Sequence, residues 1–186
     1  MISVVDTRLP GVHLARPEVH RDDRGEFWRS FCADTLDDRG IRVDVRQSNV
    51  SVNERRHTLR GFHYQRPPSV ESKVLTVITG SIYLVIADLR PASTTFLSWE
   101  PFEILAGDRT SVIVPTGCAT GFLTLEDQTI VHYQMGDVFR QECYGGFRFD
   151  DPALGVEWPF CPEVVSDRDL SHGPLDTQVF VDAATG

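Results

Sequence analysis

Short apolar segments separated by turn residues recur along most of this 186-residue chain. Ser111–Val114 and Thr129–Met135 are two of them, and both are rich in the β-branched and aromatic residues that favour strands. Further strands are predicted over residues 43–52, 59–65, 73–78, 82–88, 102–105 and 121–125. The regular alternation of short strands and turns predicts a mainly β fold, a β-sandwich or jelly roll with a few short helices.

The ends of this β-rich region carry different local patterns. Asp23-Arg24-Gly25 predicts the turn of a hairpin over residues 20–31. A short helix is predicted over residues 34–39, with Asp34 as its N-cap and Gly40 as its stop. A second short helix is predicted near residues 166–170.

Charge and cysteine content exclude several classes of protein. The formal net charge of -9 argues against nonspecific binding to nucleic acid or to an anionic membrane. No apolar run approaches the ~20 residues of a membrane span, and the N-terminus lacks the pattern of a signal peptide. The 4 cysteines are too sparse for a disulfide framework. We therefore expect a cytoplasmic protein with one domain over residues 1–186, of which 173–186 form a loosely held tail.

Groups capable of proton transfer and anion binding concentrate in the segment 59–65 and in Lys73, eight residues after it. His63 is the natural proton-transfer group, because imidazole titrates nearest to working pH. Lys73 can stabilise an oxyanion, and Arg60 can bind phosphate through its planar fork of donors. Taken by itself, the segment is equally consistent with a structural histidine beside surface cations.

His63 on a β-rich chain, with the later turn Pro115-Thr116-Gly117, resembles the cupin superfamily. Metal-binding cupins supply a His-x-His pair, a nearby Glu and a later His. In this chain Gln65 occupies the second position and Thr120 the last, which leaves Glu71 as the one additional candidate ligand. One His and one Glu are too few for a stable metal site, so we expect a metal-free cavity that acts by proton chemistry.

Motifs that extend from about Arg24 to Asp169 make the resemblance more specific. They are Asp23-Arg24-Gly25-Glu26-Phe27, Gln47-Ser48-Asn49-Val50-Ser51, Leu59-Arg60-Gly61-Phe62-His63-Tyr64-Gln65, Val114-Pro115-Thr116-Gly117, Asp151-Pro152, Trp158-Pro159 and Ser166-Asp167-Arg168-Asp169. In this order and spacing, the chain resembles the dTDP-4-dehydrorhamnose 3,5-epimerase family, the RmlC-like cupins. The resemblance implies a jelly-roll homodimer that acts on dTDP-4-dehydro-6-deoxyhexoses in deoxysugar biosynthesis, as in antibiotic pathways, without a cofactor or metal.

The resemblance also implies roles for single residues. His63 would remove the proton next to the C4 ketone, and Asp169 would orient it. Lys73 would stabilise the enolate oxygen, and Tyr133 would return a proton from the opposite face. The implied substrate-binding residues are Arg60 at the diphosphate, Gln47 and Asn49 near the nucleotide, Arg24 and Phe27 from the partner subunit, and Thr120 and Phe139 near the sugar.

Physical chemistry supports this division of roles. A carbon acid beside a ketone is far weaker than imidazolium, and each pK unit of mismatch costs ~1.4 kcal/mol. A base therefore needs a preorganised cation at the developing oxyanion. Inversion of the carbon further requires an acid on the opposite face, for which a phenol is suitable.

Four positions depart from the family pattern by changing a polar or charged group. Leu84 replaces an Asp, Thr120 a His, Phe139 a second Tyr and Arg29 an acidic residue; in addition, Glu71 replaces the usual Gln. Because the four implied catalytic residues are intact, we expect a working isomerase with an altered sugar or altered regiochemistry. The sequence leaves open whether C3, C5 or both carbons are inverted. The alternatives are a catalytically silent nucleotide-sugar-binding cupin and a metal-dependent cupin isomerase or dioxygenase.

Overall fold

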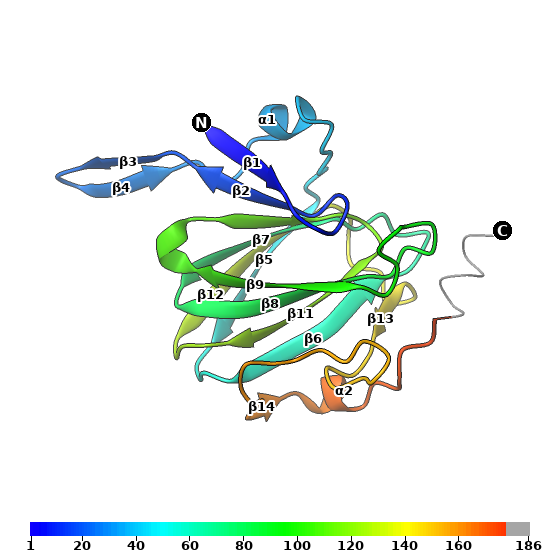
Figure 1. Cartoon of the computed structure of the whole chain (residues 1–186). Coiled ribbons are helices and arrows are strands. Elements are labelled where there is room, and N and C mark those ends of the chain that lie inside the picture. The colour runs from blue at the N-terminus through cyan, green and yellow to red at the C-terminus, as the bar shows by residue number, and fades with distance from the viewer. Residues whose placement is uncertain (178–186) are drawn as a thin grey trace.

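Two sheets of mainly antiparallel strands form the body of the protein in the computed structural model, which describes residues 1–177 (Figure 1). The first sheet has the strand order β1 (Ile2–Asp6), β2 (His13–Pro17), β10 (Ser111–Val114), β7 (Lys73–Thr79), β12 (Thr129–Met135) and β5 (Gln47–Asn53). The second has the order β13 (Tyr144–Gly146), β6 (Thr58–Gln65), β11 (Cys118–Thr124), β8 (Ser81–Asp88) and β9 (Trp99–Leu105), and β14 (Val164–Val165) pairs in parallel with β6. The predicted mainly β fold is confirmed.

The main core lies between the two sheets. Leu75 and Val77 of β7 pack there against Ile82, Leu84 and Ile86, the alternate residues of β8. Side chains of a strand alternate between its faces, so one set of alternate residues from each sheet fills the space between them. This packing fixes the facing surfaces of β7 and β6, from which the residues of the cavity described below project.

The second sheet is buried on its outer face as well. The intervening β8 residues Val85 and Ala87 pack with Phe62 and Phe147 in a separate cluster, which Trp158 partly covers. The segment between β13 and β14 therefore covers the outer face of this sheet. As a result, β8 and β11 are buried along almost their whole length.

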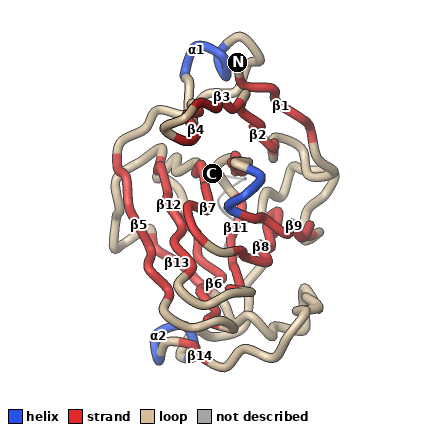
Figure 2. The backbone as a smooth tube through the Cα atoms, turned by 90° about the vertical axis from the view of Figure 1, so that its left-hand side faces the viewer, coloured by secondary structure: helices blue, strands red, loops and turns tan. Residues whose placement is uncertain are grey.

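The remaining elements lie at the two ends of the body. The hairpin of β3 (Val19–Asp22) and β4 (Gly25–Trp28) extends outward on the same side as α1 (Ala33–Asp37), whereas α2 (Asp167–Leu170) lies at the opposite end beside β14 (Figures 1 and 2). A single 3-10 turn, η1 (Ala106–Asp108), follows β9. Within residues 1–177, no helix combines the length and the apolar character needed to cross a membrane.

The structure corrects several predicted boundaries. The first helix begins at Ala33 after Cys32, so Asp34 lies in its first turn and is not its N-cap. Residues 43–46 are not part of β5, which begins at Gln47. Strands β1, β2, β13 and β14 were not predicted, and β9 and β11 begin three residues earlier than expected. Part of the predicted tail, residues 178–186, lies outside the described residues.

The described part of the predicted tail contacts the body at Leu175. The backbone N–H of Leu175 donates to the Asp151 carboxylate at 2.6 Å, and its side chain packs on the outer cluster of the second sheet. Asp151 belongs to the Asp-Pro motif identified in the sequence. That motif therefore connects the end of the described chain to the second sheet.

Candidate active site

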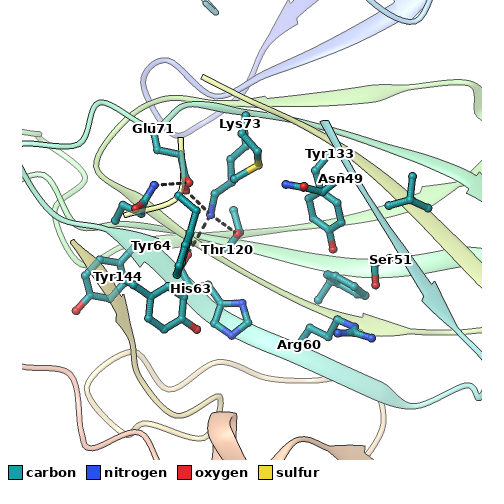
Figure 3. A pocket seen from close by; sticks show the side chains of 15 residues that line it. Asn49, Ser51, Arg60, His63, Tyr64, Glu71, Lys73, Thr120, Tyr133 and Tyr144 are labelled. Carbon is teal, nitrogen blue, oxygen red and sulfur yellow. Dashed lines mark hydrogen bonds and ion pairs between the residues drawn. The ribbon is translucent and has the colours of Figure 1, made fainter. Parts of the chain in front are cut away.

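A cavity of about 290 Å³ opens between the two sheets (Figure 3). Strands β5, β7 and β12 of the first sheet and β6, β11 and β13 of the second contribute its walls. The lining residues are Asn49, Val50, Ser51, Arg60, His63, Tyr64, Gln65, Glu71, Lys73, Thr120, Phe122, Tyr133, Met135, Phe139 and Tyr144. Of the predicted catalytic residues, His63, Lys73 and Tyr133 therefore share one cavity.

A β-bulge in β6 brings Arg60 and His63 to the same cavity. Residues three apart on a regular strand point to opposite faces. Between Arg60 and His63 the pairing with β11 shifts by one residue, which leaves Gly61 and Phe62 opposite a single residue of β11. Gly61 has a φ of 125°, in the region that favours glycine. The shift directs Arg60 and His63 into the cavity while Phe62 packs in the outer cluster.

Asp169 of α2 holds the imidazole of His63 from behind the cavity. Its Oδ1 lies 2.7 Å from His63 Nε2, and its Oδ2 accepts from the Gly61 N–H at 3.3 Å. Burial by itself raises the pKa of Asp169, but the hydrogen bond and charge of His63, with the Gly61 N–H, lower it overall. The carboxylate is therefore ionised at neutral pH and can stabilise a protonated His63.

The backbone of α2 fixes this carboxylate in position. Ser166 is the N-cap, and its hydroxyl accepts from the Asp169 N–H at 3.1 Å. The predicted pairing of His63 with Asp169, 106 residues apart in sequence, is thus present in the geometry.

Lys73 and Glu71 form a buried ion pair on the opposite wall (Figure 3). Lys73 Nζ lies 3.2 Å from Glu71 Oε1, and it also donates to the Thr120 hydroxyl at 3.2 Å and to the His63 carbonyl at 3.3 Å. Gln65 donates to the other Glu71 oxygen at 2.7 Å. Burial of a charge is costly unless the charge is paired, so Glu71 keeps a cation beside His63 in the cavity.

Tyr133 occupies the first-sheet side of the cavity on β12. Burial raises the pKa of its phenol, and the nearby charge of Arg60 and a hydrogen bond with Ser51 only partly oppose this effect. Tyr133 therefore remains a protonated phenol that can donate. The Arg60 guanidinium is oriented by its Nε, which donates to Asn53 at 2.8 Å.

The predicted substrate-binding residues divide into three groups. Asn49, Arg60, Thr120 and Phe139 line the cavity. Gln47 does not line it, but its side-chain oxygen accepts from the Phe139 N–H at 2.5 Å and so holds the loop that carries Phe139. Arg24 and Phe27 lie on the β3–β4 hairpin, outside the cavity of their own chain.

The departures from the family pattern have different structural settings. Thr120 supplies a hydroxyl to Lys73, so the residue that replaces a His keeps a polar contact inside the cavity. Leu84 is 0% exposed in the core between the sheets and is not among the lining residues. Phe139 is 50% exposed at the wall of the cavity. Arg29 is exposed and lies near Cys32.

Two aromatic residues near His63 were not predicted. The ring of Tyr144 lies 5.7 Å from the rings of both His63 and Phe139, and the Arg168 guanidinium lies 4.1 Å from its centre. The ring of His172 lies 6.3 Å from that of His63. Burial first, and then the charge of His63, lowers the pKa of His172. Both residues follow the last long strand, where the sequence has no periodic pattern to predict their position.

Comparisons with known proteins identify the same family along nearly the whole chain. The profile described as dTDP-4-dehydrorhamnose 3,5-epimerase matches residues 6–177. The chain is 34% identical over 174 residues to a protein of that name from Methanothermobacter thermautotrophicus, which covers 92% of this chain and 93% of the relative.

Two of the solved structures that share the fold illustrate the similarity. An enzyme of the same name from Bacillus anthracis, solved with TDP and PPi bound, has 33% identity and a TM-score of 0.90 over 94% of this chain and 100% of its own. ChmJ from Streptomyces bikiniensis, a 3'-monoepimerase solved with dTDP-quinovose, has 29% identity and a TM-score of 0.85 over 95% of this chain and 90% of its own.

Proposed function

Because this chain belongs to the dTDP-4-dehydrorhamnose 3,5-epimerase family, we propose that it epimerises a dTDP-4-dehydro-6-deoxyhexose in deoxysugar biosynthesis. The observation that carries the proposal is one cavity lined by His63, Lys73 and Tyr133, with Asp169 bonded to His63 from behind. This arrangement offers a base, a cation and a neutral acid around a single bound sugar.

The proposed reaction moves two protons and needs no cofactor. His63 takes the proton from the carbon next to the C4 ketone, and the electron pair of that C–H bond forms the enolate. The Lys73 ammonium stabilises the enolate oxygen, where preorganised charge is worth most. Tyr133 then donates its phenolic proton to the same carbon from the opposite face. Solvent returns a proton to Tyr133 and removes one from His63.

We propose that Arg60 holds the diphosphate and that Asn49 and Gln47 lie near the nucleotide. Arg60 and Asn49 are supported by their place on the cavity, and Gln47 by its bond to the Phe139 loop. A guanidinium binds phosphate through charge-assisted, often bidentate hydrogen bonds. The solved Bacillus anthracis relative binds TDP and PPi, which supports a nucleotide diphosphate as the ligand class.

A homodimer is proposed to complete the site, with Arg24 and Phe27 covering the nucleoside bound to the partner. The β3–β4 hairpin extends away from its own body (Figure 1), and Phe27 on β4 is 73% exposed. Edge strand β5, beside the cavity, exposes Val50 and Val52 by 63% and 55%. An interface along this edge would bury those apolar side chains.

We also propose that inversion favours C3. Phe139 offers no hydroxyl where the family pattern has a second tyrosine, and Thr120 replaces an imidazole. Proton transfer at two carbons requires two poses of the sugar, each held by its own contacts, so lost contacts penalise one pose more than the other. A 3'-monoepimerase shares this fold, so the fold is compatible with inversion at C3 alone.

The free thiols of all four cysteines support a cytoplasmic location for this enzyme.

NMR of dTDP-4-dehydro-6-deoxyglucose incubated with the protein in D₂O tests the function. Deuterium should enter mainly at C3, with formation of the C3-inverted sugar, and prior treatment with EDTA should not lower the rate. Absence of any exchange would support a silent binding protein instead. Loss of exchange on chelation, restored by one divalent ion, would support a metal-dependent cupin. Comparable exchange at C3 and C5 with double inversion would overturn the proposed regiochemistry alone.

A further inference from the structure

His172 places a second imidazole beside the His63–Asp169 pair. The ligand atoms of His63, Asp169 and His172 all lie within 4.8 Å of one another. They come from β6, from α2 and from the loop directly after α2. Three groups that are distant in sequence or on separate elements thus converge on one point behind the cavity.

The position of the His172 ring depends on a glycine. A Cβ atom added at Gly146 would overlap His172 Nε2, so a larger residue there would displace the ring. Gly146 pairs with His63 across β13 and β6, which places His172 directly beside the strand position that carries His63. The His172 ring therefore packs closely against the backbone of β13 at Gly146.

His172 Nε2 is also an unsatisfied polar atom. It is buried, and none of the residues that the structure describes forms a hydrogen bond with it. A buried polar group without a partner is costly, so such groups usually have a ligand or a role. Nothing in the proposed proton transfer uses this nitrogen.

Two imidazoles and one carboxylate are the donor set that binds divalent transition metals. Zinc bonds of about 2.0–2.2 Å hold tetrahedral ligand atoms roughly 3.3–3.6 Å apart. The His63 and Asp169 atoms, now 2.7 Å apart, would therefore have to separate, and atoms up to 4.8 Å apart would have to approach by roughly 1 Å. The Gly61 N–H holds Asp169 Oδ2, the kind of outer hydrogen bond that orients ligands in metal sites. Asp169 Oδ1 faces His63 Nε2 at 2.7 Å, and a metal would take the place of the proton between these two atoms.

We propose that His63, Asp169 and His172 bind Zn²⁺ and that the bound ion inhibits the enzyme. Because Asp169 Oδ1 faces His63 Nε2, a metal shared by the two residues binds at Nε2, replaces their hydrogen bond and withdraws electron density from the ring. This change makes His63 a weaker base, an effect that rests on its proposed role in the reaction. The site is inhibitory, so removal of metal leaves the enzyme active.

Equilibrium titration of the EDTA-treated, desalted protein with ZnCl₂ at pH 7.5 tests the site without reference to activity. The wild type should bind one Zn²⁺ per chain, and His172→Gln should weaken binding at least tenfold. His132→Gln is the matched control, because His132 is a half-buried histidine on β12 that pairs with Ser48. The absorption spectrum of the Co²⁺-loaded protein should differ from that of the wild type in His172→Gln but not in His132→Gln. This result would identify nitrogen coordination by His172.

Deuterium exchange then tests inhibition. One equivalent of Zn²⁺ should suppress exchange by the wild type and by His132→Gln, whereas His172→Gln should keep most of its rate. Equal zinc affinity of the wild type and His172→Gln, or no binding below 100-fold excess of metal, would overturn the site. Zinc binding that depends on His172 in a protein without any exchange activity would leave the metal site standing and reject the proposed function. Zinc should raise the melting temperature of the wild type and of His132→Gln but not of His172→Gln, whose melting temperature without metal should equal that of the wild type if it is folded and lacks only the site.

Discussion

At the scale of single residues, the geometry separates the proposed base from the proposed acid. His63→Ala should lower exchange at every exchanging carbon by about 10²- to 10⁴-fold, because it removes the general base. Tyr133→Phe removes only the proposed donor, so it should retain exchange while forming little inverted sugar. NMR time courses in D₂O measure both quantities together. Equal and complete loss of exchange in the two variants would contradict separate roles.

Asp169 should affect both turnover and acid stability. Asp169→Asn should reduce kcat by about 10²- to 10⁴-fold, because a neutral amide cannot stabilise protonated His63 and can hold the wrong tautomer. The pKa of Asp169 is lowered in the folded state, so its ionised form stabilises the protein above the unfolded pKa of about 3.9. That contribution is lost as pH falls through the lower, folded value.

Denaturant unfolding of the wild type and Asp169→Asn at several pH values measures this effect. The difference in free energy of unfolding should be constant near neutral pH and should shrink below pH of about 4. A difference that stays constant down to pH 3 would mean that the carboxylate pKa is not depressed by folding.

Most residues of the site were predictable because they occupy motifs with a fixed order. The pairing of His63 with Asp169 and the shared cavity of Lys73 and Tyr133 match the roles inferred from sequence, although those roles remain proposals. Tyr144 and His172 were missed because they approach His63 only through tertiary packing. Glu71 was considered as a metal ligand, whereas its contact with Lys73 gives it a charge-pairing position.

At the scale of elements, the bulge in β6 controls which side chains reach the cavity, and Gly61 makes it sterically feasible. A Cβ at Gly61 would lie 2.5 Å from Gly121 Cα and 2.7 Å from the Thr120 carbonyl oxygen, both backbone atoms of β11. Gly61→Ala must therefore push two central strands apart and strain a positive φ. We expect destabilisation of about 3 kcal/mol or more, at the upper end for single substitutions.

Gly107→Ala is the matched control for this prediction. Nothing lies within 4 Å of a Cβ built at Gly107, and its φ is outside the left-handed region. Its free energy of unfolding should change by less than about 1 kcal/mol. Thermal and urea unfolding of both variants compare them, and equal stability of Gly61→Ala and Gly107→Ala would show that the strands adjust without cost.

The strands that were predicted differ from those that were missed in the sequence patterns that they carry. Strands β10 and β12 have the predicted bounds, because β-branched and aromatic residues lie there between clear turns. Residues 43–46 alternate valine with charged residues, which also suggests a strand, but Val43 packs with Leu36 of α1 and the segment does not join the sheet. The short strands β13 and β14 carry no pattern of their own and form through pairing with β6.

At the scale of the whole molecule, the fold and the family were predictable because motifs and strand pattern both extend over almost the entire chain, and the comparisons confirm both. Contacts with a partner subunit are harder to predict from a single sequence than the fold is. An exposed Phe27 on a hairpin strand is an interface residue if a second copy covers it and an ordinary surface residue if none does. The proposed dimer thus requires an experiment in which two subunits carry different defects.

Mixing two inactive variants provides that experiment. If the hairpin acts on the partner, a subunit with Phe27→Asp keeps its own His63 and can use the intact hairpin of a His63→Ala subunit. Random pairing at equal amounts gives half heterodimers, each with one complete site, so about a quarter of wild-type activity should return. Refolding the variants together and separately, then measuring deuterium exchange, supplies the comparison. Phe160→Asp, which changes an exposed phenylalanine on another loop, should be active alone. Absence of recovery on mixing, or a fully active monomer in sedimentation at assay concentration, would mean that each chain builds its site without the partner's hairpin.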